Sequence, residues 1–162
     1  MPREMIHYRN ETGHFLYRVA GVATLGDKVL VHYFEGEPDM FLLPGGRVEM
    51  GESAEEAVSR EMREELGCEV RIDRLLWIVD NHFVHHEQTH HELGLYFAVT
   101  LPRDSEQASG RPFVATEENG QRLFFHWQPL ERLGELNLKP SCLIELLRKL
   151  PEHIQYVAHR DV

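Results

Sequence analysis

Three glutamates at positions 61, 64 and 65 are the residues whose types and spacing best support chemistry in this chain. In a helix they fall within roughly one hundred degrees of one face, because consecutive residues are about 100° apart. Like charges at this spacing repel each other, so a helix built for stability alone would avoid the arrangement. A bound divalent cation would remove the repulsion, and the spacing therefore indicates a metal site.

The helix that must carry these glutamates has clear signals at both ends. Ser53 is a good N-cap residue, and Glu56 completes a capping box with it. Gly67 supplies the left-handed conformation that commonly ends a helix. Together these signals predict a helix over residues 54–66.

The remaining residues of this helix indicate which face is turned inward. Small residues lie within about sixty degrees of Glu61, namely Ala54, Ala57 and Val58. The opposite side, which we expect to face solvent, carries Glu56, Ser59, Arg60 and Arg63. A charged stripe usually faces water, but here the glutamates share their face with the small residues. Buried carboxylates must be paired or bind a metal, and an all-oxygen set favours Mg²⁺, with Mn²⁺ as a substitute.

A glycine pair precedes the helix. Pro44-Gly45-Gly46 follows a short apolar strand expected at 40–43, and glycine lets the backbone approach a ligand closely. A Gly-Gly pair by itself is more often an ordinary turn. Its place shortly before Glu52 favours a functional interpretation.

The segment from Gly46 to Cys68 resembles the signature of the Nudix hydrolases. That signature is Gly, five residues, Glu, seven residues, then Arg-Glu-apolar-any-Glu-Glu-any-Gly-apolar. Every specified position is matched here, by Gly46, Glu52, Arg60, Glu61, Met62, Glu64, Glu65, Gly67 and Cys68. The preceding strands and the segment from Trp127 to Leu130 also look like this family, so the resemblance covers most of the chain.

The resemblance implies a role for each matched residue. Metal ions would be held by Glu61, Glu64 and Glu65, with the Gly45 carbonyl as a further ligand. Arg60 would orient the carboxylates, and Glu52 would pair with Arg60 or bind a second metal through water. Cys68 falls on an apolar position and is interpreted as a core residue. The implied reaction is cleavage of a phosphoanhydride in a nucleoside diphosphate linked to another group.

The general base of that reaction stays open at this stage. Some members of the family use a glutamate of the helix, which here is Glu61. Others use one on a later loop, where Glu117 and Glu118 are the candidates in this chain. A solvated turn is the alternative interpretation of these two glutamates.

Composition limits the partners. The chain has 162 residues, which suits one domain spanning 1–162, and a formal net charge of -10, which argues against a long nucleic acid as ligand. No apolar run approaches the roughly 20 residues of a membrane helix, so no membrane partner is expected. Two cysteines, Cys68 and Cys142, make no disulfide framework, and a cytoplasmic location is the default.

The elements around the motif are mostly strands. We expect residues 1–14 to pack loosely, and 81–91 and 102–112 to form loops. Strands are predicted at 15–25, 28–34, 70–79 with a bulge near Asp73, 92–100 and 121–127, and a second helix at 140–150. Residues 153–159 fit a strand or a helical turn, and we favour the strand. A two-residue turn at Gly26-Asp27 should join the first two. The predicted fold class is α/β, an α/β/α sandwich with a central mixed sheet.

Three residues are candidates for binding substrate: Arg18, Gly46 and Phe83. Arg18 sits in an apolar strand, where it reaches a phosphate or ribose or else pairs with a carboxylate. Phe83 could stack on a base, within a histidine-rich segment at 82–91 whose spacing matches no zinc pattern.

The sequence therefore predicts a Mg²⁺-dependent hydrolase acting on a small nucleotide, either a nucleotide sugar or a nucleoside triphosphate. The rival is a nucleotide-sensing module of the same fold that binds without turnover. Motifs that mark particular substrates within the family are not evident, and the resemblance is compatible with a homodimer.

Overall fold

A computed structural model describes residues 2–161 of the chain, so Met1 and Val162, the ends of the expected domain, lie outside the described residues. The elements in chain order are β1 (His7–Asn10), β2 (Gly13–Leu25), β3 (Lys28–Phe34), β4 (Gly45–Arg47), α1 (Ala54–Leu66), β5 (Arg71–His85), β6 (Gln88–Thr100), η1 (Glu106–Ser109), β7 (Phe113–Thr116), β8 (Arg122–Pro129), η2 (Leu130–Glu135), α2 (Leu143–Leu146) and β9 (Gln155–Asp161).

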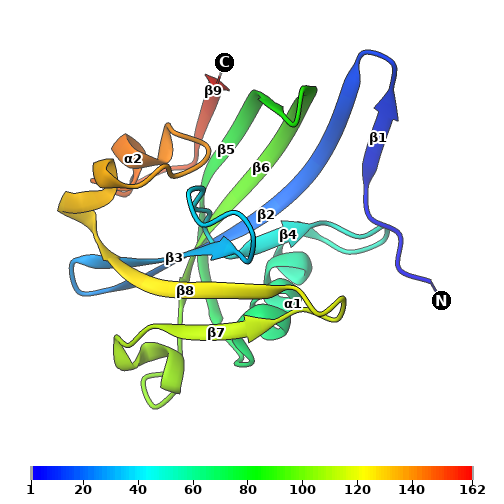
Figure 1. The fold of residues 1–162 in the computed structure, drawn as a ribbon. Helices are drawn as coiled ribbons and strands as arrows, with labels where there is room; N and C mark the ends of the chain where they lie inside the picture. The colour runs from blue at the N-terminus through cyan, green and yellow to red at the C-terminus, as the bar shows by residue number, and fades with distance from the viewer. Residues whose placement is uncertain (1, 162) are drawn as a thin grey trace.

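The strands form one mixed sheet in the order β7-β8-β3-β2-β6-β5-β9, with β1 and β4 paired to β2 (Figure 1). The pairs β2–β6 and β5–β9 are parallel, and the other pairs are antiparallel. Strand β2 is the organising element, because its first half pairs with β1, β4 and β6 and its end turns into β3. The expected two-residue turn at Gly26-Asp27 is confirmed by the pairing of Leu25 with Lys28.

Two apolar cores lie against this sheet. One joins residues of α1, such as Val58 and Met62, to β2, β6 and β8, and the other joins η2 and α2 to residues of β2, β3, β5 and β6. Helical segments therefore cover both faces, as the α/β/α sandwich predicts. No helix of residues 2–161 is long and apolar enough to cross a bilayer.

Helix α1 begins and ends as predicted. The Ser53 side chain accepts from the Glu56 backbone N–H, the Glu56 carboxylate accepts from the Ser53 N–H, and Gly67 has a φ of 70°. The capping box satisfies backbone donors that the first helical turn leaves free. The orientation of the glutamates is thus set by local sequence.

The histidine-rich segment at 81–91 was wrongly predicted as a loop. It forms the ends of β5 and β6, joined by a two-residue turn in which His86 and Glu87 have φ values of 50° and 63°. Turns of this kind usually carry Asn-Gly or Asp-Gly, so two non-glycine residues in the left-handed region hide the hairpin from a sequence pattern. The predicted bulge near Asp73 is confirmed by a register shift between Ile72 and Arg74.

Smaller corrections concern the ends of elements. Within the segment 1–14, which was expected to pack loosely, β1 is hydrogen-bonded to β2 although its side chains are exposed. Residues 40–43 make only isolated bridges, the predicted helix at 140–150 is reduced to one α-helical turn at Leu143–Leu146, and β7 was not foreseen. The strand expected at 153–159 is present as β9.

Candidate active site

The carboxylate cluster, by which we mean Glu61, Glu64 and Glu65, lies on the inward side of α1. Glu61 and Glu65 are only 8% and 6% exposed, whereas the Glu64 side chain is 37% exposed. Two of the three carboxylates are therefore removed from bulk water, as the small residues on the same face predicted. This burial is what distinguishes the cluster from a solvated acidic stripe.

The glycine pair forms strand β4 rather than the turn that was expected, and it packs directly against the cluster. A Cβ on Gly46 would lie 2.3 Å from the Glu61 carboxylate, and one on Gly45 would lie 2.1 Å from the Val19 carbonyl oxygen of β2. Any side chain at either position would displace its neighbour. Glycine is therefore required here for close approach, not for an unusual turn.

The Gly45 peptide groups point toward the helix. The Gly45 N–H donates to Glu65 Oε2 at 3.2 Å, while the ladder bonds to β2 on either side are made by Pro44 and Val48. In an antiparallel pair, N–H and C=O of one residue point to the same side. The Gly45 carbonyl is thus turned away from β2, to the side on which Glu65 lies.

Arg60 ties the cluster together, although the helix wheel had assigned it to the solvated side. Its side chain is only 13% exposed. The guanidinium donates to Glu52 at 2.6 and 3.0 Å, to Glu61 at 2.9 Å, to Glu64 at 3.3 Å and to the Arg47 carbonyl at 3.0 Å. The wheel failed because a long arginine side chain reaches sideways around the helix. These contacts place Arg60 where it orients the carboxylates.

Burial and charge act differently on the carboxylates. Hydrogen bonds from Arg60 lower the pKa of Glu52. Burial raises the pKa of Glu61 despite Arg60, and burial followed by the charge of Glu61 raises the pKa of Glu65 well above its usual value. The only hydrogen bond that a described residue donates to the Glu65 carboxylate comes from Gly45. Closely spaced, under-compensated oxygen ligands fit a divalent cation such as Mg²⁺.

The two later glutamates differ in position. Glu117 is half-buried, and its pKa is raised by burial first and by the charge of Glu64 second. Glu118 is exposed. The structure thus brings Glu117 toward the cluster and leaves Glu118 in solvent. Chain alternation accounts for the difference, because neighbouring residues at a strand end point to opposite sides.

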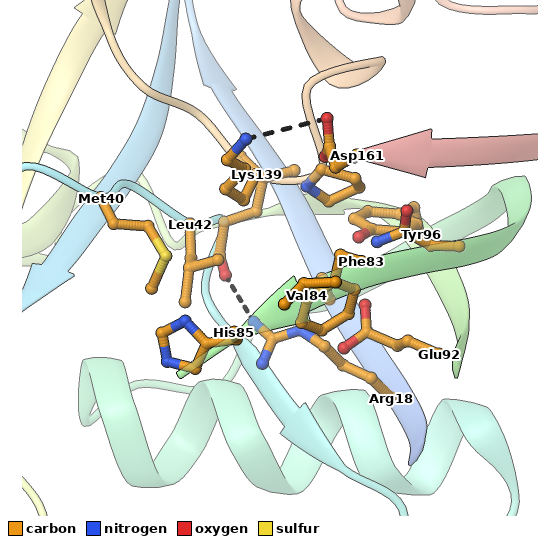
Figure 2. Close-up of a pocket in the computed structure, with 14 residues that line it drawn as sticks. Arg18, Met40, Leu42, Phe83, Val84, His85, Glu92, Tyr96, Lys139 and Asp161 are labelled. Atoms are coloured by element: carbon orange, nitrogen blue, oxygen red, sulfur yellow. Dashed lines mark hydrogen bonds and ion pairs between the residues drawn. The ribbon is translucent and has the colours of Figure 1, made fainter. Parts of the chain in front are cut away.

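A cavity of about 230 Å³ has Arg18 in its lining (Figure 2), and the charge of this arginine also acts on Glu61 of the cluster. Arg18 donates to the Leu43 carbonyl at 3.0 Å. Burial raises the pKa of both Glu61 and Glu92, and the charge of Arg18 opposes that rise. Phe83 lines the same cavity, and its ring stacks on His90 with centroids 4.9 Å apart. The structure therefore places Arg18 and Phe83 in the lining of this cavity, whereas Gly46 lies against the Glu61 carboxylate and is not one of the lining residues.

A family model that matches most of the chain decides the family. The family model for the NUDIX domain matches residues 15–150. The chain belongs to the NUDIX domain family. The carboxylate cluster and Gly46 are positions of the signature matched in the sequence.

One curated relative of this NUDIX chain is an ADP-ribose pyrophosphatase of Methanocaldococcus jannaschii. It is 39% identical over 67 residues, and the match spans only 40% of each chain. The aligned part thus covers less than half of that relative.

Solved structures agree on the fold. A UDP-X diphosphatase superposes with a TM-score of 0.64 at 23% identity, covering 88% of this chain and 66% of the other. A mutator MutT protein from Bacillus halodurans gives 0.60 at 18% identity, covering 89% of each chain. An ADP-ribose pyrophosphatase from Streptococcus suis gives 0.56 at 18% identity, covering 90% of this chain and 98% of the other. At these identities the likeness concerns the fold alone.

Two residues of the site were missed by sequence reasoning. Asn81 and Glu92 are 3% and 9% exposed, line the cavity and are direct cross-strand partners. Burial raises the pKa of Glu92, whereas Arg18 and Arg47 oppose the shift. A hairpin register through the histidine-rich segment would have brought these residues together, but the segment was interpreted as a loop.

Proposed function

We propose that this NUDIX protein is a Mg²⁺-dependent hydrolase that cleaves the pyrophosphate linkage of a nucleoside diphosphate derivative. The observation that carries the proposal is the burial of Glu61 and Glu65 against the glycine pair, together with a cavity lined by Arg18, whose charge also acts on Glu61. A structural domain would gain nothing from two buried, partly uncompensated carboxylates.

The metal would be held by the carboxylates of Glu61, Glu64 and Glu65 and by the Gly45 carbonyl. When bound, Mg²⁺ supplies neutralisation of the diphosphate charge and acidification of a coordinated water. The Glu65 carboxylate is buried and accepts a hydrogen bond from the Gly45 N–H, so it would enter the ligand set in a fixed position. The Arg60 guanidinium holds the carboxylates of Glu61 and Glu64 in place by donating a hydrogen bond to each.

Proton transfer requires a carboxylate near the attacking water. Glu61 and Glu117 are the stronger candidates for the base, because both are withdrawn from bulk solvent. Glu118 is a third candidate for the base, and its side chain is exposed to solvent. Arg18, which lines the cavity and acts on Glu61 through its charge, would bind a phosphate of the substrate.

The substrate proposed is a nucleotide sugar or a nucleoside triphosphate, and the products would be a nucleoside monophosphate and a second phosphorylated species. The names of the relatives, an ADP-ribose pyrophosphatase and a UDP-X diphosphatase, support a diphosphate-linked nucleotide. The free thiols of Cys68 and Cys142 suit a reducing cytoplasm.

The test is a panel of nucleoside triphosphates and nucleotide sugars incubated with the protein and Mg²⁺, with products identified by chromatography. Cleavage at the anhydride in wild type, lost on chelation and in Glu64→Gln, supports the proposal. Glu55→Gln is the matched control, because Glu55 lies on the same helix but is exposed. Binding without turnover would overturn the hydrolase and favour the nucleotide-sensing module.

A further inference from the structure

The floor of the cavity holds two buried polar side chains that the proposed chemistry does not use. Asn81 and Glu92 face each other across β5 and β6, and we call this pair the pocket floor. Figure 2 shows the Glu92 carboxylate directed into the pocket beneath Phe83.

The pocket floor has no adequate partners within the protein. Among residues 2–161 the buried Asn81 Oδ1 accepts no hydrogen bond, and Arg18 and Arg47 act on the Glu92 carboxylate through their charge without a hydrogen bond to it. Both groups are more than nine-tenths buried. An unpaired polar group at such a site costs free energy, so the floor is built to be completed by a ligand.

The chemistry of the floor selects its ligand. A carboxylate offers two neighbouring acceptor oxygens, and an amide offers one donor and one acceptor. Guanine presents two adjacent donors, N1–H and the exocyclic amino group, next to the O6 acceptor. Adenine, cytosine and uracil each lack such a pair of donors. We propose that the pocket floor binds the guanine edge, with Glu92 accepting from N1–H and one hydrogen of the 2-amino group and the unpaired Asn81 Oδ1 accepting from the second hydrogen of that amino group.

The walls of the pocket fit a planar ring. Phe83, Leu42 and Met40 provide apolar surface around the floor, and stacking on His90 fixes the plane of Phe83. Apolar walls with a few directed polar groups are the usual composition of a small-molecule site. A base held on the floor would direct its 5′ phosphates past Arg18 toward the carboxylate cluster.

The inference rests on the proposed function for its ligand class, but its test does not need turnover. Nucleoside monophosphates contain no anhydride, so their binding is measurable whether or not the protein is a hydrolase. Isothermal titration of the full chain with GMP, IMP, AMP and UMP, in the presence of Mg²⁺, gives the four affinities. IMP differs from GMP only by the missing 2-amino group.

We expect GMP to bind at least tenfold more tightly than IMP, AMP and UMP, because the other bases leave the carboxylate incompletely paired. In Glu92→Gln the preference for GMP should fall at least tenfold, while AMP and UMP change less than twofold. The control variant, Glu55→Gln, should behave as wild type.

Equal affinities for the four nucleotides would overturn the proposal, since they would indicate that Glu92 binds the ribose diol or nothing at all. An equal loss for all four in Glu92→Gln, or no binding by any, would also overturn it. Should Glu92→Gln fold poorly, the comparison of GMP with IMP in wild type decides the question alone. Loss of hydrolysis with guanine selectivity retained would overturn the proposed function and leave this inference standing.

Discussion

The carboxylate cluster and the pocket floor both bury acidic groups, but they treat the charge in different ways. In the cluster, Arg60 donates to Glu61 and Glu64 and to Glu52 outside the cluster. On the floor, Arg18 and Arg47 act on the Glu92 carboxylate through their charge, without a hydrogen bond to it among the described residues. The cluster is partly neutralised before any ligand arrives, whereas the floor is not.

This difference matches two different tasks. Catalytic groups must keep one geometry through the reaction, so an arginine that holds several carboxylates at once is useful. A recognition group is selective when it has no hydrogen-bond partner within the protein. A ligand that leaves such a group unpaired then binds weakly. The substitutions below separate the two regions, from the largest expected effect to the smallest.

The largest effect on activity is expected for Glu61→Gln in the cluster. Removing one buried carboxylate of the proposed metal site should lower kcat by at least a hundredfold. The melting temperature should stay within about 5 °C of wild type, because a neutral side chain relieves the burial penalty. Steady-state kinetics with Mg²⁺ and a thermal melt measure both, and an activity near that of wild type would contradict the metal-ligand role.

The glycine pair offers a matched test of close packing. In Gly45→Ala the new Cβ meets the Val19 carbonyl of the backbone, so the free energy of unfolding should fall by about 3 kcal/mol. In Gly46→Ala it meets the carboxylate of Glu61, which is a movable side chain. The second variant should therefore fold well and lose at least tenfold in kcat. Urea unfolding and kinetics compare the two, and equal stability losses would refute the distinction.

Arg18 tests the link between the two regions. In Arg18→Gln the KM of a nucleotide substrate should rise about tenfold, because a phosphate-binding cation is lost. The ratio of GMP to IMP affinities should stay as in wild type, since the base contacts remain. Arg148→Gln is the control, as this arginine is exposed and far along the chain. A changed base preference would show that Arg18 also contacts the base.

The smallest effect on activity is expected at His32, a buried ionisable group that belongs to neither region and acts on stability instead. Burial lowers the pKa of His32 from 6.5 to about 3. Between these values the unfolded chain binds a proton that the folded chain does not. The contribution of neutral His32 to the free energy of unfolding is therefore complete above pH 6.5. It is lost as the pH falls toward 3, at about 1.4 kcal/mol per pH unit.

Removing this histidine should flatten the acid dependence of stability. His32→Phe should show a shallower fall in the free energy of unfolding between pH 6.5 and 4.5 than wild type does. Phe34 and Phe125 already surround the site, so the aromatic replacement suits its environment. The exposed His153 supplies the control, and His153→Phe should leave the slope as it is. Parallel slopes for all three proteins would contradict the prediction.

The cluster could be predicted from sequence because its information is local. The capping box at Ser53 and the left-handed Gly67 fix the helix, and helical geometry then fixes which face carries Glu61 and Glu65. The glycine pair was recognised for the right property, close approach, but assigned to a turn, since strand β4 depends on its pairing with β2. The reach of Arg60 was missed because a helix wheel describes Cβ directions and not the ends of long side chains.

The pocket floor could not be predicted in the same way. Asn81 and Glu92 are eleven positions apart, and they meet only because a hairpin closes at His86 and Glu87. That turn lacks the residues that usually announce it, so the register on which the pairing depends has no local signal. The amino-acid sequence alone determined the helix, its caps and its row of carboxylates, because each arises from contacts within a few residues. Only the tertiary structure decided what those carboxylates face and which distant side chains form the adjoining pocket, because strand register and burial are properties of the whole sheet.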